Sequence, residues 1–420
     1  MSPFELELHR RLGAIREQGL WRELRRVDSP QGPTVDIAGR TLVNFSSNDY
    51  LALASHPALK ESARSAVERY GTGSGASRLV CGSLAPHHEL EDSLAAFKGT
   101  QAALTFSTGY ATALGTITAL MGRDDYIIID KLVHASIVDA AKLSGAKLRV
   151  FRHNDLADLE AKLTWARSGA GGPARAARGV SPRRGPAHHS KPTNVLIITE
   201  SVFSMDGDLA PLHNIVELKD RFGAWLMVDE AHATGLFGGH RRGLVEEFGV
   251  SDRVEIQMGT LGKAVGSSGG YIAGSRALVD LLINRARSFI FSTAPVPAAA
   301  AAARAGIGLI QLPEGERRRR RLWSLVELLK RALLAGPGKL PAVRSAIAPL
   351  MIGDAQRALW IASALREAGF LVPAIRSPTV ATGRERLRFT VTADHTEEQI
   401  QSLEAALAAL GNRRPHAPHA

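Results

Sequence analysis

Asp229, His232 and Lys263 have the residue types and the order along the chain of a cofactor-binding site. Asp229 directly follows the apolar run Trp225–Val228, His232 lies in the segment after it, and Lys263 ends the segment Gly259–Lys263. A pyridinium cofactor needs a carboxylate at its ring nitrogen, a polar group at its ring hydroxyl and a lysine amine for covalent attachment. Together, these three side chains would supply those groups.

Taken one at a time, the same residues have simpler interpretations. Asp229 could cap a turn, His232 could be a structural histidine, and Lys263 could be a surface lysine in a flexible loop. The cofactor hypothesis also requires Lys263 to lose its proton, although free lysine has a pKa of about 10.4. Burial and a nearby cation can lower a lysine pKa to roughly 7–8, which suits a general base. Several glycines around Lys263 would let a bulky group approach the backbone: Gly262, Gly266, Gly269 and Gly270.

Further segments extend this pattern. They read NFSSNDYL at 44–51, GTGSGASR at 71–78, HHELE at 87–91, TESVFSMDGD at 199–208, and PTV at 378–380 followed by RLR at 386–388. Together with the two motifs above, they resemble the α-oxoamine synthase family of fold-type I pyridoxal-phosphate enzymes. The resemblance spans roughly residues 45–395, and it implies that the cofactor is pyridoxal 5'-phosphate.

The resemblance implies cofactor roles residue by residue. Lys263 would bond to the cofactor and act as the base, and Asp229 would pair with the ring nitrogen. His232 and Ser204 would lie near the ring hydroxyl, and His134 would stack on the ring, with a helix start as its simpler interpretation. The cofactor phosphate would be held at a helix N-terminus by Gly109 and Tyr110, with Thr260 nearby. The implied catalytic set is Lys263, His134, Asp229 and His232.

The resemblance also implies a set of substrate contacts, which are Arg25, Asn48, His134, Thr379 and Arg388. Asn48 and Arg388 would hold the carboxylate of an amino acid, because the guanidinium fork binds both carboxylate oxygens. Arg25, with neighbouring Arg26 as the alternative, and Thr379 would contact the acyl substrate. The implied reaction is a decarboxylative condensation of a small amino acid with an acyl thioester, and no metal is expected.

Two stretches bear on the choice of substrates. Residues 283–294 and 375–380 are most similar to the family members that join L-alanine to a pimeloyl thioester, carried by coenzyme A or a carrier protein, in biotin biosynthesis. Condensation of glycine with acetyl-CoA is the alternative, because a single methyl group changes discrimination by only about 1–3 kcal/mol. A non-catalytic homologue that binds nucleic acid or protein through its basic segments is a hypothesis of a different class.

Short apolar runs in the middle of the chain predict the elements that must position these residues. Strands buried on both faces and joined by helical crossovers form a mostly parallel sheet with helices on both sides. Ligands gather beyond the carboxyl ends of such strands, where the motifs fall. The runs are Ala102–Phe106, Tyr126–Ile129, Leu148–Phe151, Val195–Thr199, Trp225–Val228, Val254–Met258 and Gly270–Ala273. We therefore predict an α/β fold with a seven-stranded sheet in its large domain.

The sequence changes character after Ala294, where long helices and isolated strand-like runs indicate a smaller α+β domain. We predict an N-terminal helix and short strand at 1–45, a cofactor-binding large domain at 46–294, a C-terminal small domain at 295–410 and a tail at 411–420. Residues 167–193 would form a basic loop inserted in the large domain.

Composition narrows the range of partners. The single cysteine, Cys81, excludes an intramolecular disulfide and a zinc site built from cysteines. No apolar run reaches the roughly 18–20 residues of a membrane span. With a single cysteine, a reducing cytoplasm is the default expectation. Part of the net charge of +11 lies in residues 167–193 and 411–420, which we interpret as solvated segments and not as a nucleic-acid surface. The family resemblance implies a homodimer with active sites at the subunit boundary.

Overall fold

A seven-stranded sheet forms the centre of the larger region of the molecule in this computed structural model, which describes residues 1–168 and 193–411. Within this sheet β9 pairs antiparallel with both of its neighbours, β3 and β8, and the other adjacent strands pair in parallel. In spatial order the strands are β3 (Ala102–Phe106), β9 (Gly270–Gly274), β8 (Ile256–Thr260), β7 (Trp225–Asp229), β6 (Val195–Glu200), β4 (Tyr126–Asp130) and β5 (Lys147–Phe151). The predicted α/β class and mostly parallel seven-stranded sheet are confirmed.

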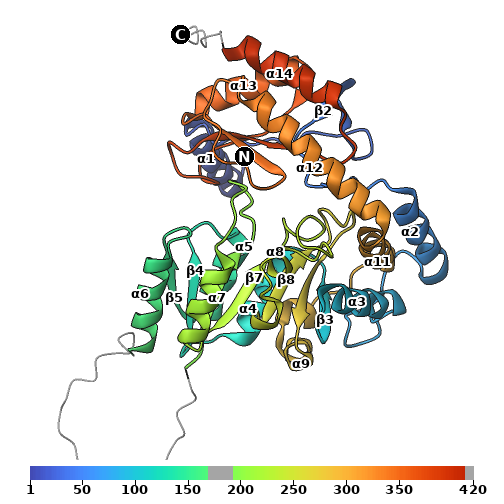
Figure 1. Cartoon of the computed structure of the whole chain (residues 1–420), viewed down its shortest axis with the longest axis vertical. Coiled ribbons are helices and arrows are strands. Elements are labelled where there is room, and N and C mark those ends of the chain that lie inside the picture. Colours follow the sequence, from blue (N-terminus) through green and yellow to red (C-terminus); the bar gives the residue numbers. More distant parts are fainter. Residues whose placement is uncertain (169–192, 412–420) are drawn as a thin grey trace, which may run out of the picture.

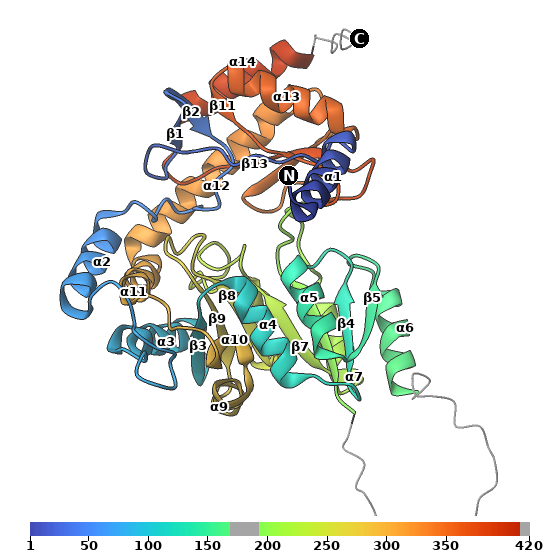
Figure 2. The ribbon, with the colours of Figure 1, turned by 180° about the vertical axis from the view of Figure 1, so that it is seen from behind.

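Helices cover both faces of this sheet (Figures 1 and 2). Successive strand residues point to opposite faces, so Ile127 and Ile129 of β4 join one apolar cluster while Tyr126 and Ile128 join the other. The first cluster packs against α4 (Gly109–Leu120), α5 (Ala135–Ser144), α9 (Arg276–Arg285) and α10 (Arg287–Ile290). The second packs against α3 (Ala85–Lys98), α6 (Leu156–Arg167) and α7 (Leu212–Arg221).

A smaller α+β region lies at one end of the molecule and holds the first and the last helix of the described residues (Figure 1). One three-stranded sheet has the order β10 (Ile347–Met351), β13 (Arg386–Thr390), β12 (Ala374–Ile375). A second three-stranded sheet pairs two strands from the N-terminal part of the chain with one from the C-terminal part, in the order β1 (Thr34–Ile37), β2 (Arg40–Asn44), β11 (Phe370–Leu371). The helices of this region are α1 (Pro3–Glu17), α12 (Pro313–Leu333), α13 (Ala355–Glu367) and α14 (Glu397–Gly411).

The remaining helices connect these parts. They are α2 (Pro57–Tyr70), the short α8 (Leu244–Glu247), a 3₁₀ turn at Ser251–Arg253, and α11 (Pro297–Gln311), which packs on α2 and α3. The predicted domain boundaries stay a prediction. The predicted basic loop 167–193 and tail 411–420 lie, except for residues at their ends, outside the described residues.

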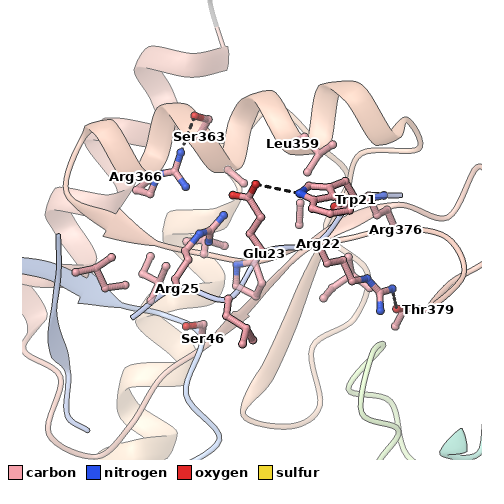
Figure 3. Close-up of a pocket in the computed structure, with 18 of the residues that line it drawn as sticks. Trp21, Arg22, Glu23, Arg25, Ser46, Leu359, Ser363, Arg366, Arg376 and Thr379 are labelled. Atoms are coloured by element: carbon pink, nitrogen blue, oxygen red, sulfur yellow. Dashed lines mark hydrogen bonds between the residues drawn. The ribbon is translucent and has the colours of Figure 1, made fainter. Parts of the chain in front are cut away.

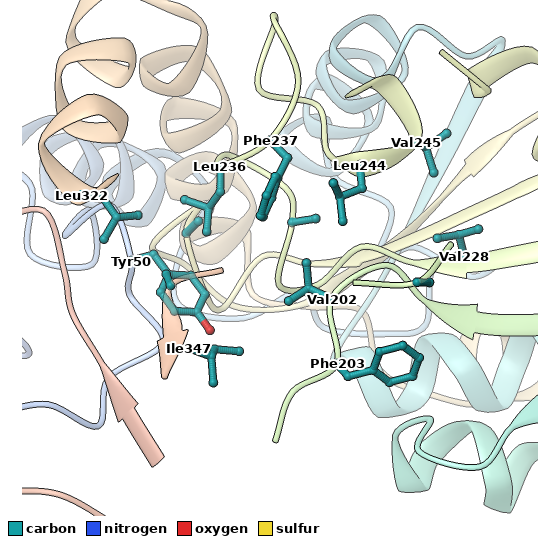
Figure 4. Close-up of a cluster of buried hydrophobic side chains, with 14 of the residues drawn as sticks. Tyr50, Val202, Phe203, Val228, Leu236, Phe237, Leu244, Val245, Leu322 and Ile347 are labelled. Carbon is teal, nitrogen blue, oxygen red and sulfur yellow. The ribbon is translucent and has the colours of Figure 1, made fainter. Parts of the chain in front are cut away.

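One apolar core runs through both regions. Val228 of β7, Leu322 of α12 and Ile347 of β10 belong to the same cluster of buried side chains, together with Tyr50 (Figure 4). A shared core of this kind fixes the sheet edge relative to the small region, because burying apolar surface stabilises by roughly 25 cal/mol per Å². Within residues 1–168 and 193–411, no helix combines the length and apolar character needed to cross a bilayer.

Candidate active site

The predicted cofactor residues gather at the carboxyl edge of the large sheet. Asp229 is the last residue of β7 and Thr260 the last of β8, while His134 follows β4 by a short turn. Gly109 begins α4, directly after β3. Because neighbouring parallel strands end at the same edge, residues far apart in the sequence meet there.

Lys263 lies at one end of a chain of close polar contacts. Its Nζ is 2.7 Å from His232 Nε2, and His232 Nδ1 is 2.7 Å from the Tyr50 hydroxyl. Burial lowers the pKa of Lys263 to about 8, with Arg388 acting in the same direction and the carboxylates of Asp229 and Glu200 opposing it. Burial, together with the cations of Lys263 and Arg388, holds the pKa of His232 well below its usual value. A neutral imidazole thus faces an amine that is readily deprotonated.

Asp229 and Glu200 are paired residues at the ends of β7 and β6. Asp229 Oδ1 accepts a hydrogen bond from Ala231 N at 2.9 Å, and burial raises the pKa of Asp229. Burial and the charge of Asp229 raise the pKa of Glu200 to about 8. Glu200 Oε2 accepts from Ser204 N, but its Oε1 has no hydrogen-bond partner among the described residues.

This pair of carboxyl groups provides a test of whether the site fits a pyridinium cofactor. Asp229 is 6% exposed, and within residues 1–168 and 193–411 it forms no ion pair. A buried carboxylate needs a cationic partner, and a protonated ring nitrogen would be one. The residues present therefore fit pyridoxal phosphate. Glu200 lies in the TESVFSMDGD motif, but the sequence alone predicts no role for it.

The start of α4 has the features of a phosphate cradle. Thr108 caps the helix by accepting from Ala111 N at 3.0 Å. A Cβ on Gly270 would lie 2.9 Å from Gly109 N, so only glycine fits beside this helix start. A Cβ on Gly109 would lie 3.8 Å from Thr260 Cβ, which brings the Thr260 side chain next to the backbone amides. Helix N-terminal amides bind phosphate well.

His134 and Tyr110 occupy helix starts on the same edge. His134 caps α5, where its Nδ1 lies 3.2 Å from Ser136 N and 2.8 Å from Ser136 Oγ. The simpler interpretation of His134 as a helix-start residue is thus confirmed, while its stacking role stays a prediction. The Tyr110 hydroxyl donates to Asp139 Oδ2 at 2.7 Å, so its side chain is held by α5.

The predicted carboxylate clamp lies at the junction between the two regions. Arg388 of β13 donates from Nη2 to Asn48 Oδ1 at 3.1 Å and from Nε to the Ser204 carbonyl at 2.6 Å. The Tyr50 hydroxyl also donates to Asn48 Oδ1, at 3.3 Å. Tyr50, which sequence reasoning missed, therefore links the Asn48–Arg388 pair to His232. Its place in the NFSSNDYL motif gave no signal that it would reach a residue far along the chain.

A separate pocket of about 710 Å³ lies in the small region, between α13 and the segment 21–27 (Figure 3). Arg25 and Thr379 both line it, as does Arg22, whose Nη2 is 3.5 Å from Thr379 Oγ1. Arg26 instead pairs with Asp28 at 2.6 Å. The structure therefore favours Arg25 over Arg26 as a pocket residue and adds Arg22.

Comparisons with known proteins give a consistent picture. The family described as aminotransferase class I and II matches residues 40–407. An 8-amino-7-oxononanoate synthase from Geobacter sulfurreducens is 48% identical over 400 residues, which cover 95% of this chain and 96% of that protein. Another from Anaeromyxobacter dehalogenans is 45% identical over 399 residues, with 95% and 94% covered.

Solved structures show the same resemblance. A serine palmitoyltransferase variant from S. paucimobilis, solved with a bound PLP–myriocin aldimine, superimposes with a TM-score of 0.85 at 29% identity, and 96% of each chain is covered. An 8-amino-7-oxononanoate synthase from Francisella tularensis gives a TM-score of 0.69 at 26% identity, with 88% of this chain and 97% of that one covered.

Proposed function

The chain belongs to the aminotransferase class I and II family, among the 8-amino-7-oxononanoate synthases, and we propose that it condenses L-alanine with a pimeloyl thioester. The products are 8-amino-7-oxononanoate, carbon dioxide and a free thiol, and the pathway is biotin biosynthesis. The enzyme is an acyltransferase that depends on pyridoxal phosphate. The observation that carries the proposal is the continuous line of contacts from Lys263 through His232, Tyr50 and Asn48 to Arg388.

Lys263 carries the proton transfers of the reaction. When bound, pyridoxal phosphate supplies an electron sink for the electron pair left on the α-carbon. With its pKa lowered to about 8, Lys263 is neutral in a sizeable fraction of molecules near that pH and can accept the α-proton. The same amine returns a proton to the product after carbon dioxide has left.

Arg388 and Asn48 orient the amino acid. The Nε of Arg388 is held by the Ser204 carbonyl, so its terminal nitrogens are directed by a fixed neighbour and can bind the substrate carboxylate. Fixing the carboxylate fixes the direction of the bonds at the α-carbon relative to Lys263, which lowers the entropic part of the barrier.

The other predicted residues hold the cofactor. Asp229 would neutralise the ring nitrogen, and His232 with Ser204 would contact the ring hydroxyl. His134 would cover the ring. The phosphate would bind at the start of α4, through Gly109, Tyr110 and Thr260.

The acyl substrate would contact Arg25 and Thr379, which line one pocket. Its carrier, coenzyme A or a carrier protein, is left open by these contacts. We also propose a cytoplasmic homodimer, in which the second subunit completes each site, and the domain boundaries given above.

Two measurements test the function. Turnover of L-alanine with pimeloyl-CoA should exceed that of glycine with acetyl-CoA, and the reverse result would favour glycine C-acetyltransferase. Lys263→Ala should lose turnover by at least about 10⁴-fold, because it removes both the covalent bond and the base. Lys142→Ala, at an exposed lysine of α5, is the matched control, and full activity of Lys263→Ala would refute the mechanism.

A further inference from the structure

His153, just after β5, lies between two carboxylates that come from different parts of the chain. Its Nδ1 is 2.9 Å from Asp130 Oδ1 and its Nε2 is 2.7 Å from Asp208 Oδ2. A carboxylate only accepts hydrogen bonds, so both contacts are satisfied together when both ring nitrogens carry a proton. The Phe203 ring packs edge-on against the imidazole, with centroids 4.4 Å apart.

The next residue holds the same two carboxylates. Asn154 N donates to Asp130 Oδ2 at 2.9 Å, and Asn154 Nδ2 donates to Asp208 Oδ2 at 3.0 Å. The φ angle of Asn154 is +55°, a left-handed conformation that asparagine tolerates better than most residues. His153 and Asn154 therefore form a two-residue clamp between Asp130 and Asp208.

The Asp130 side of the clamp leads to the turn before His134, the residue proposed to cover the cofactor ring. Asp130 is the fully buried last residue of β4, and its Oδ1 also accepts from Leu132 N at 2.8 Å. This bond shapes the turn between β4 and His134. Movement of Asp130 would therefore displace the residue proposed to cover the ring.

The Asp208 side leads to the small region. Asp208 ends the loop 203–208, which Phe203 N closes by donating to the Asp208 carbonyl at 3.0 Å. Within this loop, the Ser204 carbonyl accepts from Arg388 Nε at 2.6 Å, and the Asp206 carboxylate pairs with Arg386 at 2.5 Å. The loop is thus the support on which the carboxylate-binding Arg388 rests.

We propose that His153, as an imidazolium, is a positioning residue that ties the turn carrying His134 to the loop carrying Ser204. Through these two connections it fixes the position of the His134 ring, which is proposed to cover the cofactor, relative to the Arg388 guanidinium. The clamp acts on the site without touching either substrate. As a clamp, His153 would affect the binding of the cofactor as much as that of the amino acid.

The charge of His153 makes the clamp dependent on pH. Burial alone would lower the pKa of His153, but the hydrogen bonds that its ring donates to the carboxylates of Asp130 and Asp208 outweigh this effect and raise the pKa to about 9. Asp130 from β4 and Asp208 from the loop after β6 are the titratable side chains that contact the ring among the described residues. Because the folded-state pKa exceeds the ordinary value of about 6.5, the stabilisation is complete below about pH 6.5 and is lost as pH rises through about 9.

The first test observes the proton directly. Holoenzyme labelled with ¹⁵N-histidine would be titrated by NMR, with the His153 signals assigned by their loss in His153→Gln. Both ring nitrogens should stay protonated until the pH approaches about 9. Loss of one proton near the ordinary pKa of about 6.5 would overturn the proposal.

The second test separates positioning from stability. His153→Gln keeps hydrogen-bonding groups but no charge, and we expect it to raise the dissociation constants of pyridoxal phosphate and of L-alanine by about tenfold each, with a smaller effect on kcat. Asp208→Asn should give the same changes. The double variant should add little to either single variant, because both substitutions remove the same interaction between His153 and Asp208. His240→Gln, which removes an exposed histidine whose ring contacts Glu246, should change neither constant.

The outcomes are distinguishable from failure of the proposed function. The alanine measurement rests on that function, whereas the NMR titration and the pyridoxal-phosphate measurement do not depend on which amino acid binds. If His153→Gln lowers Tm but leaves both dissociation constants unchanged, the residue is merely structural and the proposal is wrong.

Discussion

The proposed site has two halves, one for the cofactor and one for the substrates, and the two are built differently. The cofactor half consists of residues at or just after the ends of adjacent strands, such as Asp229 and Thr260, whose places are fixed by the hydrogen-bonded sheet. The substrate half consists of Arg388 from β13, Asn48 from a loop, and Arg22, Arg25 and Thr379 around a pocket. Rigid strand ends suit the chemistry that every turnover repeats, and separate segments suit the recognition of a particular substrate.

Asp229→Asn should break the cofactor half most severely. The amide keeps the shape but cannot neutralise the ring nitrogen, so we expect kcat to fall by about 10²–10³-fold, the usual cost of losing one electrostatic contact in a site. The KM for L-alanine should change little. Steady-state kinetics, with circular dichroism to check folding, measures both constants. An equally large rise in the KM for L-alanine would mean that the two halves are not separate.

Arg388→Lys should affect the substrate half instead. A lysine keeps the charge but loses the fork, so the KM for L-alanine should rise by about 10–100-fold, since a hydrogen bond to a charged group contributes about 1.5–3 kcal/mol. Affinity for pyridoxal phosphate should stay near the wild-type value. Arg384→Lys, at a more exposed arginine near Asp206, is the control. If Arg388→Lys loses affinity for pyridoxal phosphate while Arg384→Lys does not, the cofactor and substrate halves are not separate.

The pH dependence of cofactor attachment sharpens the account of Lys263. Only the neutral amine is a nucleophile, and burial lowers its pKa to about 8. In cofactor-free protein, the rate of attachment should therefore rise about tenfold per pH unit below 8 and level off above it. The change in visible absorbance during reconstitution measures the rate. A rate of attachment that does not change with pH would mean that deprotonation of the Lys263 amine does not control this step.

Arg22→Ala should give the smallest effect. Arg22 is exposed and contacts Thr379 at 3.5 Å, and exposed contacts of charged groups contribute about 0.2–1 kcal/mol. We expect the KM for the acyl thioester to rise about two- to fivefold, with no change for L-alanine. Arg26→Ala, which removes a residue paired with Asp28 outside the pocket, should have no effect on either KM.

The difference between the halves also explains what the sequence could reveal. Apolar runs correspond to all seven strands of the large sheet, and Asp229 could be placed at a strand end because an apolar run stops there. Glu200, Tyr50 and Arg22 were missed because their roles depend on contacts with residues far along the chain. No periodicity or local motif encodes such contacts, and the same holds for the position of His153 between Asp130 and Asp208.

Reductive trapping tests the central claim most directly. Holoenzyme treated with sodium borohydride should keep the cofactor as a stable covalent adduct, and mass spectrometry of its peptides should find the added mass on Lys263. An adduct on another lysine, or no adduct in protein that is fully active, would contradict the assignment on which both halves of the site depend.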